Sequence, residues 1–317
     1  MHNRFVQRPS RVKRWLAASA LLLVAAAALW WSLADFETIS VYNDAAAPRL
    51  VPVPHRESPA ARMALVRGGG GPHDFAPVGV LKPFDAAGMV PDIIVGSSIG
   101  ALIGALYAAK PDAAALEALI LDADISPSSA DLALTRRPWR SGTRIEQLLC
   151  DQLGAQQLQA LRLPMVVVAT DVASGVPAAF SSGDAVTAVR ASSAVPGTFK
   201  RIRIEGREYF DDDVTAPIPV SLARARAAKI IVAVDVMCHP AEMLEVMRDS
   251  ADLIMPDFYR HAINLRERPG ADVMISPRLG YHAGFSREAR QRYIAIGEAA
   301  ANSAMPAIRQ RLEASAP

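Results

Sequence analysis

Residues 95–107 read Val-Gly-Ser-Ser-Ile-Gly-Ala-Leu-Ile-Gly-Ala-Leu-Tyr, and they predict a strand, a sharp turn and a helix in immediate succession. A strand-to-helix turn of this kind forces its middle residue into a strained backbone conformation, and the flanking Gly96 and Gly100 carry no side chains that would clash there. Ser98 would then stand at the carboxyl end of a strand and at the start of a helix, whose dipole favours negative charge. The segment therefore predicts an acyl-transfer nucleophile at Ser98, and a tight turn selected for packing alone is the alternative.

Short apolar runs with many β-branched residues occur on both sides of this turn. Because they are apolar nearly throughout, they predict strands buried on both faces of a mostly parallel sheet, with the Ala- and Leu-rich stretches between them as covering helices. Lys200 to Asp211 has a turn at Glu205-Gly206 and predicts a hairpin. The fold class is thus α/β. The five predicted strands are Met63–Val66, Asp92–Val95, Met165–Ala169, Lys229–Val234 and Asp272–Ile275.

A run of four glycines, Gly68–Gly71, follows the first predicted strand. A dinucleotide-binding loop is disfavoured because Asp74 stands where the last glycine of Gly-x-Gly-x-x-Gly belongs, and a phosphate loop is disfavoured because no Gly-Lys-Ser/Thr follows. An oxyanion hole made by backbone N–H groups fits best, since Ser98 follows about one βα unit later. A flexible loop without function is the alternative.

A serine nucleophile needs a base, and the sequence offers two kinds. Of the six histidines, His239, His261 and His282 come late enough for the chain order Ser, Asp, His, but none lies in a motif. Residues 209–219 place three consecutive acids between a strand end and a proline-led helix. Adjacent carboxylates raise one another's pKa, which suits one of them to act as a base near neutrality. A solvated acidic turn or a helix cap is the alternative.

The composition excludes several classes of protein. The chain has 317 residues, 51% of them hydrophobic and 21% charged, with a formal net charge of +2, so it is neither a disordered tail nor a polytopic membrane protein. Basic residues dominate only the first 34 positions, and the remainder is slightly acidic, which disfavours a nucleic-acid partner. Two cysteines, Cys150 and Cys238, are too few for a disulfide scaffold or a thiolate metal site.

The N-terminus predicts a membrane segment. Residues 1–14 are basic, and residues 15–34 carry no charge and are long enough to span a bilayer as a helix. The basic flank predicts that residues 1–14 stay cytoplasmic and that the following domain lies on the non-cytoplasmic side. A retained anchor is favoured; a cleaved signal peptide, which would give an exported soluble form, and a buried helix are the alternatives. Residues 35–61 are Pro-rich and predict a linker or an extended arm before a domain over residues 62–317.

From about Met63 to Arg311, the chain resembles the patatin-like phospholipase family, and in particular its bacterial members. The resemblance rests on five pieces that occur in order along the chain. They are the glycine loop, Val78-Gly79-Val80-Leu81-Lys82, Gly96-Ser97-Ser98-Ile99-Gly100, Ala191-Ser192-Ser193-Ala194-Val195-Pro196-Gly197 and the acidic segment at Asp211.

This resemblance implies a three-layer α/β/α fold and a Ser-Asp dyad in place of a triad. Ser98 resembles the nucleophile, Asp211 the base, and Gly69, Gly70 and Gly71 the oxyanion loop. The implied reaction is hydrolysis of acyl esters of phospholipids or related lipids, of the phospholipase A or lysophospholipase type, at a membrane and with neither cofactor nor metal.

The sequence departs from the family pattern at two places. His73 and Asp74 stand where the glycine loop usually continues to a basic residue and another glycine, and Asp212 stands where glycine usually follows the catalytic Asp. These departures keep a second hypothesis open, a degenerate patatin-like protein that binds lipid or a partner without catalysis. A third hypothesis is a Ser-His-Asp esterase of the α/β-hydrolase type that uses His239, His261 or His282.

Overall fold

The computed structural model describes residues 40–41, 49–50, 61–70, 73, 75–123, 143–196, 199–237, 260–280, 284 and 286–315. The chain divides into two compact units, Met1–Thr38 and Ile39–Pro317, and every described residue belongs to the second. Within this part of the chain, no helix combines the length and the apolar character that a membrane crossing requires. The predicted membrane segment, residues 15–34, lies outside the described residues.

One mixed sheet runs through the described part of the chain. Its main path has the order β1-β7-β8-β5-β4-β3-β9-β10, and β6 pairs with both β5 and β2. The strands are β1 (Ser40–Val41), β2 (Arg49–Leu50), β3 (Met63–Arg67), β4 (Ile93–Ser97), β5 (Met165–Asp171), β6 (Pro177–Ser182), β7 (Ile202–Ile204), β8 (Arg207–Phe210), β9 (Ile230–Val234) and β10 (Val273–Ile275).

The parallel part of the sheet consists of β5, β4, β3, β9 and β10, with Leu65 of β3 opposite Ile94 of β4 and Val232 of β9. Away from these five strands, β6 and β8 run antiparallel to β5, and β7 runs antiparallel to β8. The prediction of a mostly parallel sheet therefore holds for the central strands only. Strands joined by short turns, as β5–β6 and β7–β8 are, must run antiparallel, because a parallel pair needs a long crossover.

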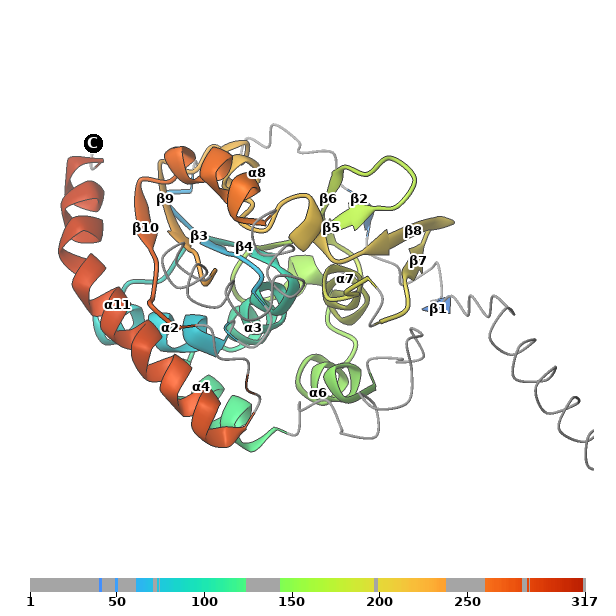
Figure 1. Cartoon of the computed structure of the whole chain (residues 1–317), viewed down its shortest axis with the longest axis horizontal. Helices are drawn as coiled ribbons and strands as arrows, with labels where there is room; N and C mark the ends of the chain where they lie inside the picture. The colour runs from blue at the N-terminus through green and yellow to red at the C-terminus, as the bar shows by residue number, and fades with distance from the viewer. Residues whose placement is uncertain are drawn as a thin grey trace, which may run out of the picture. The chain divides into compact units, whose positions relative to one another are not determined.

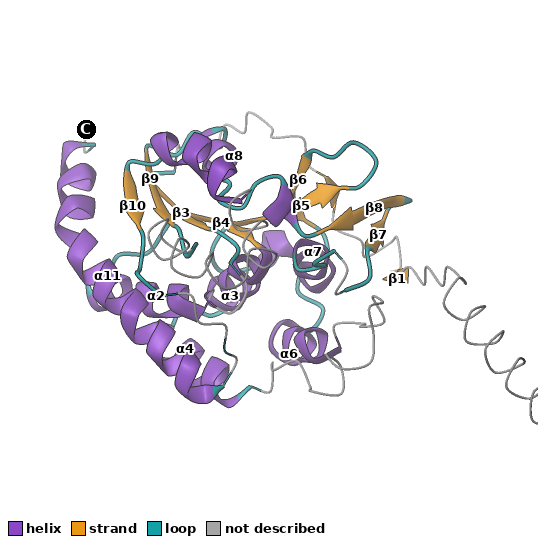
Figure 2. Ribbon diagram, in the orientation of Figure 1, coloured by secondary structure: helices purple, strands orange, loops and turns teal. Residues whose placement is uncertain are grey.

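Seven labelled helices are described. They are α2 (Ala76–Ala86), α3 (Ser98–Ala109), α4 (Ala113–Asp122), α6 (Thr143–Leu153), α7 (Ala185–Ser192), α8 (Val220–Arg224) and α11 (Arg287–Ala314). Figures 1 and 2 show α2, α3 and α7 on one side of the sheet and α8 on the other. Two buried apolar clusters match this arrangement: Leu65 and Val232 belong to the first, and Val66 and Ile231 belong to the second together with Val220 of α8. Successive side chains of a strand thus point to opposite faces of the sheet, and helices cover both faces, which gives a layer of helices on each side of the sheet.

The predicted strands agree with β3, β4, β5, β9 and β10 to within a few residues, and the predicted hairpin is β7–β8, with Glu205 and Gly206 both at positive φ. The sequence reasoning missed β6, whose Pro-Ala-Ala-Phe-Ser-Ser sequence lacks β-branched residues. Within the predicted linker, Ser40–Val41 pairs with β7 and Arg49–Leu50 pairs with β6.

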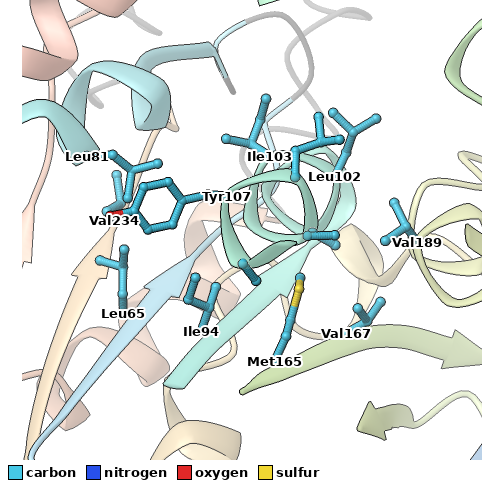
Figure 3. Packing of buried hydrophobic residues seen from close by; sticks show 14 of the residues in the cluster. Leu65, Leu81, Ile94, Leu102, Ile103, Tyr107, Met165, Val167, Val189 and Val234 are labelled. Atoms are coloured by element: carbon cyan, nitrogen blue, oxygen red, sulfur yellow. The ribbon is translucent and has the colours of Figure 1, made fainter. Parts of the chain in front are cut away.

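The core places α3 directly on the central strands. Leu102, Ile103 and Tyr107 of α3 are buried, and Figure 3 shows them above Ile94 and Met165 of the sheet. A β-carbon added to Gly104 would lie 3.0 Å from Met165 Cε and 3.2 Å from Ile94 Cγ2, so the helix approaches the strands closely. This close approach fixes the first turn of α3, and hence Ser98, at the carboxyl end of β4.

Candidate active site

Ser98 occupies the turn between β4 and α3 in the left-handed backbone region, with a φ of 52°. The neighbouring positions 96 and 100 leave no room for a side chain, so both must be glycine. A β-carbon on Gly96 would lie 2.7 Å from Ala101 Cα, and one on Gly100 would lie 2.6 Å from the Gly68 carbonyl oxygen. A non-glycine residue at positive φ marks strain that the surrounding structure must hold in place. The turn therefore has the geometry that the sequence predicted for a nucleophile.

The Ser98 side chain lies against one carboxylate. Its Oγ donates a hydrogen bond to Asp211 Oδ2 at 2.6 Å, and its backbone N–H donates to Ser192 Oγ at 2.8 Å. Ser98 is 3% exposed and Asp211 is fully buried. The two residues that the resemblance implied as nucleophile and base, although 113 positions apart, are thus in direct contact.

The position of Asp211 is set by the segment that follows β8. Its N–H donates to the Ala194 carbonyl at 3.1 Å, and its own carbonyl accepts a hydrogen bond from Thr170 Oγ1 at 3.3 Å. Its Oδ1 accepts the Asp213 N–H at 2.9 Å, which leaves Oδ2 for Ser98. Both carboxylate oxygens are therefore held, and the carboxylate is oriented before any substrate binds.

Burial raises the pKa of Asp211 to about 7, while the hydrogen bond from Ser98 and the positive charge of Arg260 act in the opposite direction. A carboxylate whose pKa lies near neutrality is suited to accept a proton from a hydroxyl group. The environment of Asp211 thus combines the geometry and the proton affinity of a general base.

The two following aspartates have different surroundings, although all three are consecutive. Asp212 is fully buried, and its Oδ1 accepts a hydrogen bond from Ser192 Oγ at 3.4 Å. Burial and then the charge of Asp211 raise the pKa of Asp212 well above its ordinary value, against the hydroxyls of Ser97 and Ser192. Asp213 instead forms an ion pair with Arg260.

The glycine loop lies against the nucleophile. A β-carbon on Gly69 would lie 1.9 Å from Asp213 Oδ1 and 2.9 Å from Ser98 Cβ, so no side chain fits there. The Gly69 N–H, however, donates to the Pro217 carbonyl at 2.9 Å, and the Gly68 N–H donates to the Val234 carbonyl at 3.3 Å. The predicted role of Gly69 as an N–H donor to an oxyanion is therefore not met in this arrangement, because that hydrogen is already used.

Of the other two glycines predicted as oxyanion donors, Gly70 is described and Gly71 is not. Gly70 is partly buried at the end of the described loop, and Gly71 lies outside the described residues, as does Asp74. His73 is described, and its ring contacts that of Tyr293 edge to face at 5.4 Å. His73, which stands where the family usually has a basic residue, thus contacts α11 through its ring.

Of the three histidines predicted as alternative bases, His261 is the one that the structure describes, and the carboxylate hydrogen-bonded to Ser98 is that of Asp211. His261 lies in the helix of residues 260–267, and its charge acts on Asp235. His239 and His282 lie outside the described residues.

No metal site is evident among the described residues, where no group of three or more His, Cys, Asp or Glu side chains converges. Cys150 is exposed on α6 with its thiol free, and Cys238 lies outside the described residues.

Two neighbours of the site were missed at the level of sequence. Ser192 lies in a segment that carried the resemblance, but nothing in the sequence showed that its hydroxyl would accept the Ser98 N–H. Arg260 belongs to a helix on another part of the chain, and no motif or spacing connects it to Asp213.

Comparison with known families agrees with this arrangement. A family model described as Patatin-like phospholipase matches residues 65–224, a range that includes the glycine loop, Ser98 and Asp211. The chain belongs to the patatin-like phospholipase family. Membership supports lipid hydrolysis in the general sense, and the mixed-sheet α/β architecture is that of a patatin-like domain.

Individual relatives match part of the chain. An uncharacterized NTE family protein of Mycobacterium tuberculosis is 29% identical over 180 residues, which cover 56% of this chain and 50% of the relative. The human patatin-like phospholipase domain-containing protein 6 is 29% identical over 195 residues, which cover 59% of this chain and 14% of the relative. The patatin-like chain therefore corresponds to half or less of these relatives' length.

Among solved structures, VipD from Legionella pneumophila is similar with a TM-score of 0.48 and 13% identity, over 81% of this chain and 67% of that chain. The type III effector protein ExoU is similar with a TM-score of 0.40 and 12% identity, over 80% of this chain and 54% of that chain.

Proposed function

We propose that this patatin-like protein is a serine acyl hydrolase that cleaves acyl esters of phospholipids or related lipids through Ser98 and Asp211. One observation carries the proposal: Ser98, strained at a φ of 52°, donates a hydrogen bond of 2.6 Å to the fully buried Asp211. Nucleophile and base within hydrogen-bond reach are the signature of activated-serine catalysis.

The proposed reaction proceeds in two steps. Ser98 Oγ attacks the ester carbonyl carbon while Asp211 takes the hydroxyl proton, and the proton then passes to the leaving alcohol as the ester C–O bond breaks. A water molecule next attacks the acyl-enzyme, Asp211 accepts its proton, and the fatty acid leaves as Ser98 regains a hydrogen. The start of α3 and Gly69 border the site where the oxyanion would form, and backbone N–H groups of the helix start and of the glycine loop would stabilise it.

Because the Gly69 N–H donates to the Pro217 carbonyl, this bond must open before Gly69 can donate to an oxyanion, and the oxyanion roles of Gly70 and Gly71 stay predictions from the sequence. The reaction as proposed requires neither cofactor nor metal, since Asp211 supplies the base and the loop supplies the electrostatic stabilisation.

A second candidate function is lipid or partner binding without catalysis. The engagement of the Gly69 N–H with Pro217 and the extra carboxylates of Asp212 and Asp213 favour it. It predicts that the chain binds lipid while Ser98 forms no acyl intermediate.

The cellular location is a further proposal that rests on sequence. A lipid hydrolase needs access to a bilayer, and residues 15–34 would hold the domain at the membrane on the non-cytoplasmic side if they are retained. Fractionation of cells that express the full chain, with protease protection of the domain, would test this location.

The activity test uses the purified full chain and phospholipid vesicles, with released fatty acid as the readout. We expect wild-type protein to release fatty acid and Ser98→Ala to lose about 10⁴-fold or more of the rate, as for other catalytic units. Asp211→Asn should be similarly impaired, and Ser303→Ala, on the exposed part of α11, should match wild type. Activity retained in Ser98→Ala would refute the assignment, and an inactive folded wild type would favour the binding function.

A further inference from the structure

A chain of hydrogen bonds links the backbone of the nucleophile to Asp212 through Ser192. The Ser98 N–H donates to Ser192 Oγ at 2.8 Å, and the Ser192 hydroxyl donates in turn to Asp212 Oδ1 at 3.4 Å. Ser192 and Asp212 are both fully buried, and Ser98 is nearly so. These hydrogen bonds connect the first residue of α3, the last residue of α7 and the segment that follows β8.

The first link of this chain satisfies a group that otherwise has no partner. Backbone N–H groups in the first turn of a helix lack intrahelical acceptors, and a buried N–H without an acceptor is costly. At Ser98 this need coincides with a strained backbone at a φ of 52°. The Ser192 hydroxyl therefore supplies the bond that holds the Ser98 backbone, and with it the direction of Oγ, in place.

The second link depends on the state of Asp212. Among the described residues, Asp211 and Asp213 neighbour it on its own segment, and Arg260 from the helix of residues 260–267 pairs with Asp213. Asp212, by contrast, accepts its side-chain hydrogen bond from the neutral hydroxyl of Ser192. A fully buried carboxyl beside a second carboxylate, and with no cation paired to it in the part of the chain that the structure describes, favours the protonated form.

We propose that Ser192 and Asp212 are positioning residues that hold the Ser98 turn, with Asp212 serving as a neutral acceptor that keeps one proton while Asp211 works as the base. This inference rests on the proposed function of Ser98. It gives a role to Asp212, the residue at which this chain departs from the family pattern of glycine after the catalytic Asp. Three acids in a row then have three separate tasks: base, positioning group and ion-pair partner of Arg260.

The test compares Ser192→Ala, Asp212→Leu and Asp212→Asn in the full chain, with circular dichroism to verify folding. Ser192→Ala and Asp212→Leu should lower kcat by about 10- to 100-fold with little change in KM, as expected for a misplaced reacting group. Asp212→Asn should restore most of the rate lost in Asp212→Leu, because the amide oxygen can accept the Ser192 hydroxyl without a charge. Ser303→Ala is again the matched control.

The pH profile separates a neutral Asp212 from an ionised one. If Asp212 is neutral in the wild type, Asp212→Asn leaves the midpoint of the kcat/KM profile in place. If it is ionised, removal of that negative charge lowers the pKa of Asp211 and moves the midpoint to lower pH, which would overturn the proposal. Unchanged kcat in Ser192→Ala would overturn it as well.

Hydrogen exchange at the Ser98 amide distinguishes failure of this inference from failure of the proposed function. One outcome is that wild-type protein hydrolyses no lipid, while its Ser98 amide is protected and loses this protection in Ser192→Ala. In that case the positioning role of Ser192 stands and the catalytic function fails. If the wild type is active and the Ser98 amide exchanges equally fast in both proteins, the positioning role fails and the catalytic function stands.

Discussion

Asp211 is a carboxylate whose chemistry is set by its burial. Its pKa of about 7 means that it is largely protonated in mild acid and ionised above neutrality. Because only the ionised form can accept the Ser98 proton, we expect kcat/KM for ester hydrolysis to fall as the pH drops through about 7.

A pH-rate profile of the wild type measures this dependence, and Arg260→Gln provides the comparison. The positive charge of Arg260 lowers the pKa of Asp211, so its removal should move the midpoint to higher pH. A profile that stays flat through neutrality, or a midpoint that moves to lower pH in Arg260→Gln, would contradict a catalytic Asp211.

The same burial has a consequence for stability. The pKa of Asp211 in the folded protein, about 7, lies above its ordinary value of 3.8, so the folded state binds this proton more tightly than the unfolded chain does. Its contribution to the free energy of unfolding is therefore fully present below about pH 4 and is lost as the pH rises through about 7.

At this scale the prediction of Ser98 as the nucleophile came from its own neighbourhood, because the glycines required by a sharp strand-to-helix turn are local. The choice of Asp211 among three consecutive acids came from the family pattern. Local sequence could not supply it, since the different partners of Asp212 and Asp213, Ser192 and Arg260, come from distant parts of the chain.

At the scale of elements, the contact between α2 and α11 depends on two glycines. A β-carbon on Gly297 would lie 2.0 Å from the Ala76 carbonyl oxygen, and one on Gly79 would lie 1.8 Å from the Ile294 carbonyl oxygen. Both obstacles are backbone atoms, which cannot rotate away as a flexible side chain can. The two helices therefore pack at a distance that only glycine permits.

We expect Gly297→Ala to lower the free energy of unfolding by about 1–3 kcal/mol, because the helices must separate to make room. Gly104→Ala in α3 is the matched control, since its β-carbon would meet only side-chain atoms, the nearest being Met165 Cε at 3.0 Å. Urea denaturation of the two variants measures the difference. An equal free energy of unfolding in the two variants would show that α2 and α11 can move apart at little cost, which would contradict this prediction.

The elements that sequence predicted best are the buried strands with many β-branched residues, β3, β4, β5, β9 and β10. Their signal is local and strong. The short pairings of Ser40–Val41 and Arg49–Leu50 could not be predicted, because a Pro-rich segment without alternation carries no pattern that specifies which strand edge it joins.

At the scale of the whole domain, ion pairs with two buried carboxylates join the helix of residues 260–267, and Arg268 directly after it, to the carboxyl side of the sheet. Arg260 pairs with Asp213, and Arg268 Nη1 lies 2.5 Å from Oδ2 of Asp235, which follows β9 and is 2% exposed. Asp235 also accepts hydrogen bonds from the Met237 N–H at 3.1 Å and from Asn264 Nδ2 at 3.5 Å. These contacts fix the helix that carries Arg260 beside the Ser98–Asp211 pair.

Arg268→Gln should lower the free energy of unfolding by up to about 3 kcal/mol, because it leaves a buried carboxylate without its cation. Arg287→Gln is the control: its partner Asp122 is exposed, and loss of a surface pair costs less than about 1 kcal/mol. Thermal or urea unfolding measures both. Equal losses would indicate that the Arg268–Asp235 pair behaves as a surface pair.

The central claim, that Ser98 is an activated nucleophile, is tested most directly by covalent labelling. A fluorophosphonate probe is added to the folded protein, and the modified peptide is identified by mass spectrometry. We expect the label on Ser98, its absence in Ser98→Ala and strongly slowed labelling in Asp211→Asn. A folded wild-type protein that takes no label, or that is labelled equally well in Asp211→Asn, would contradict the account.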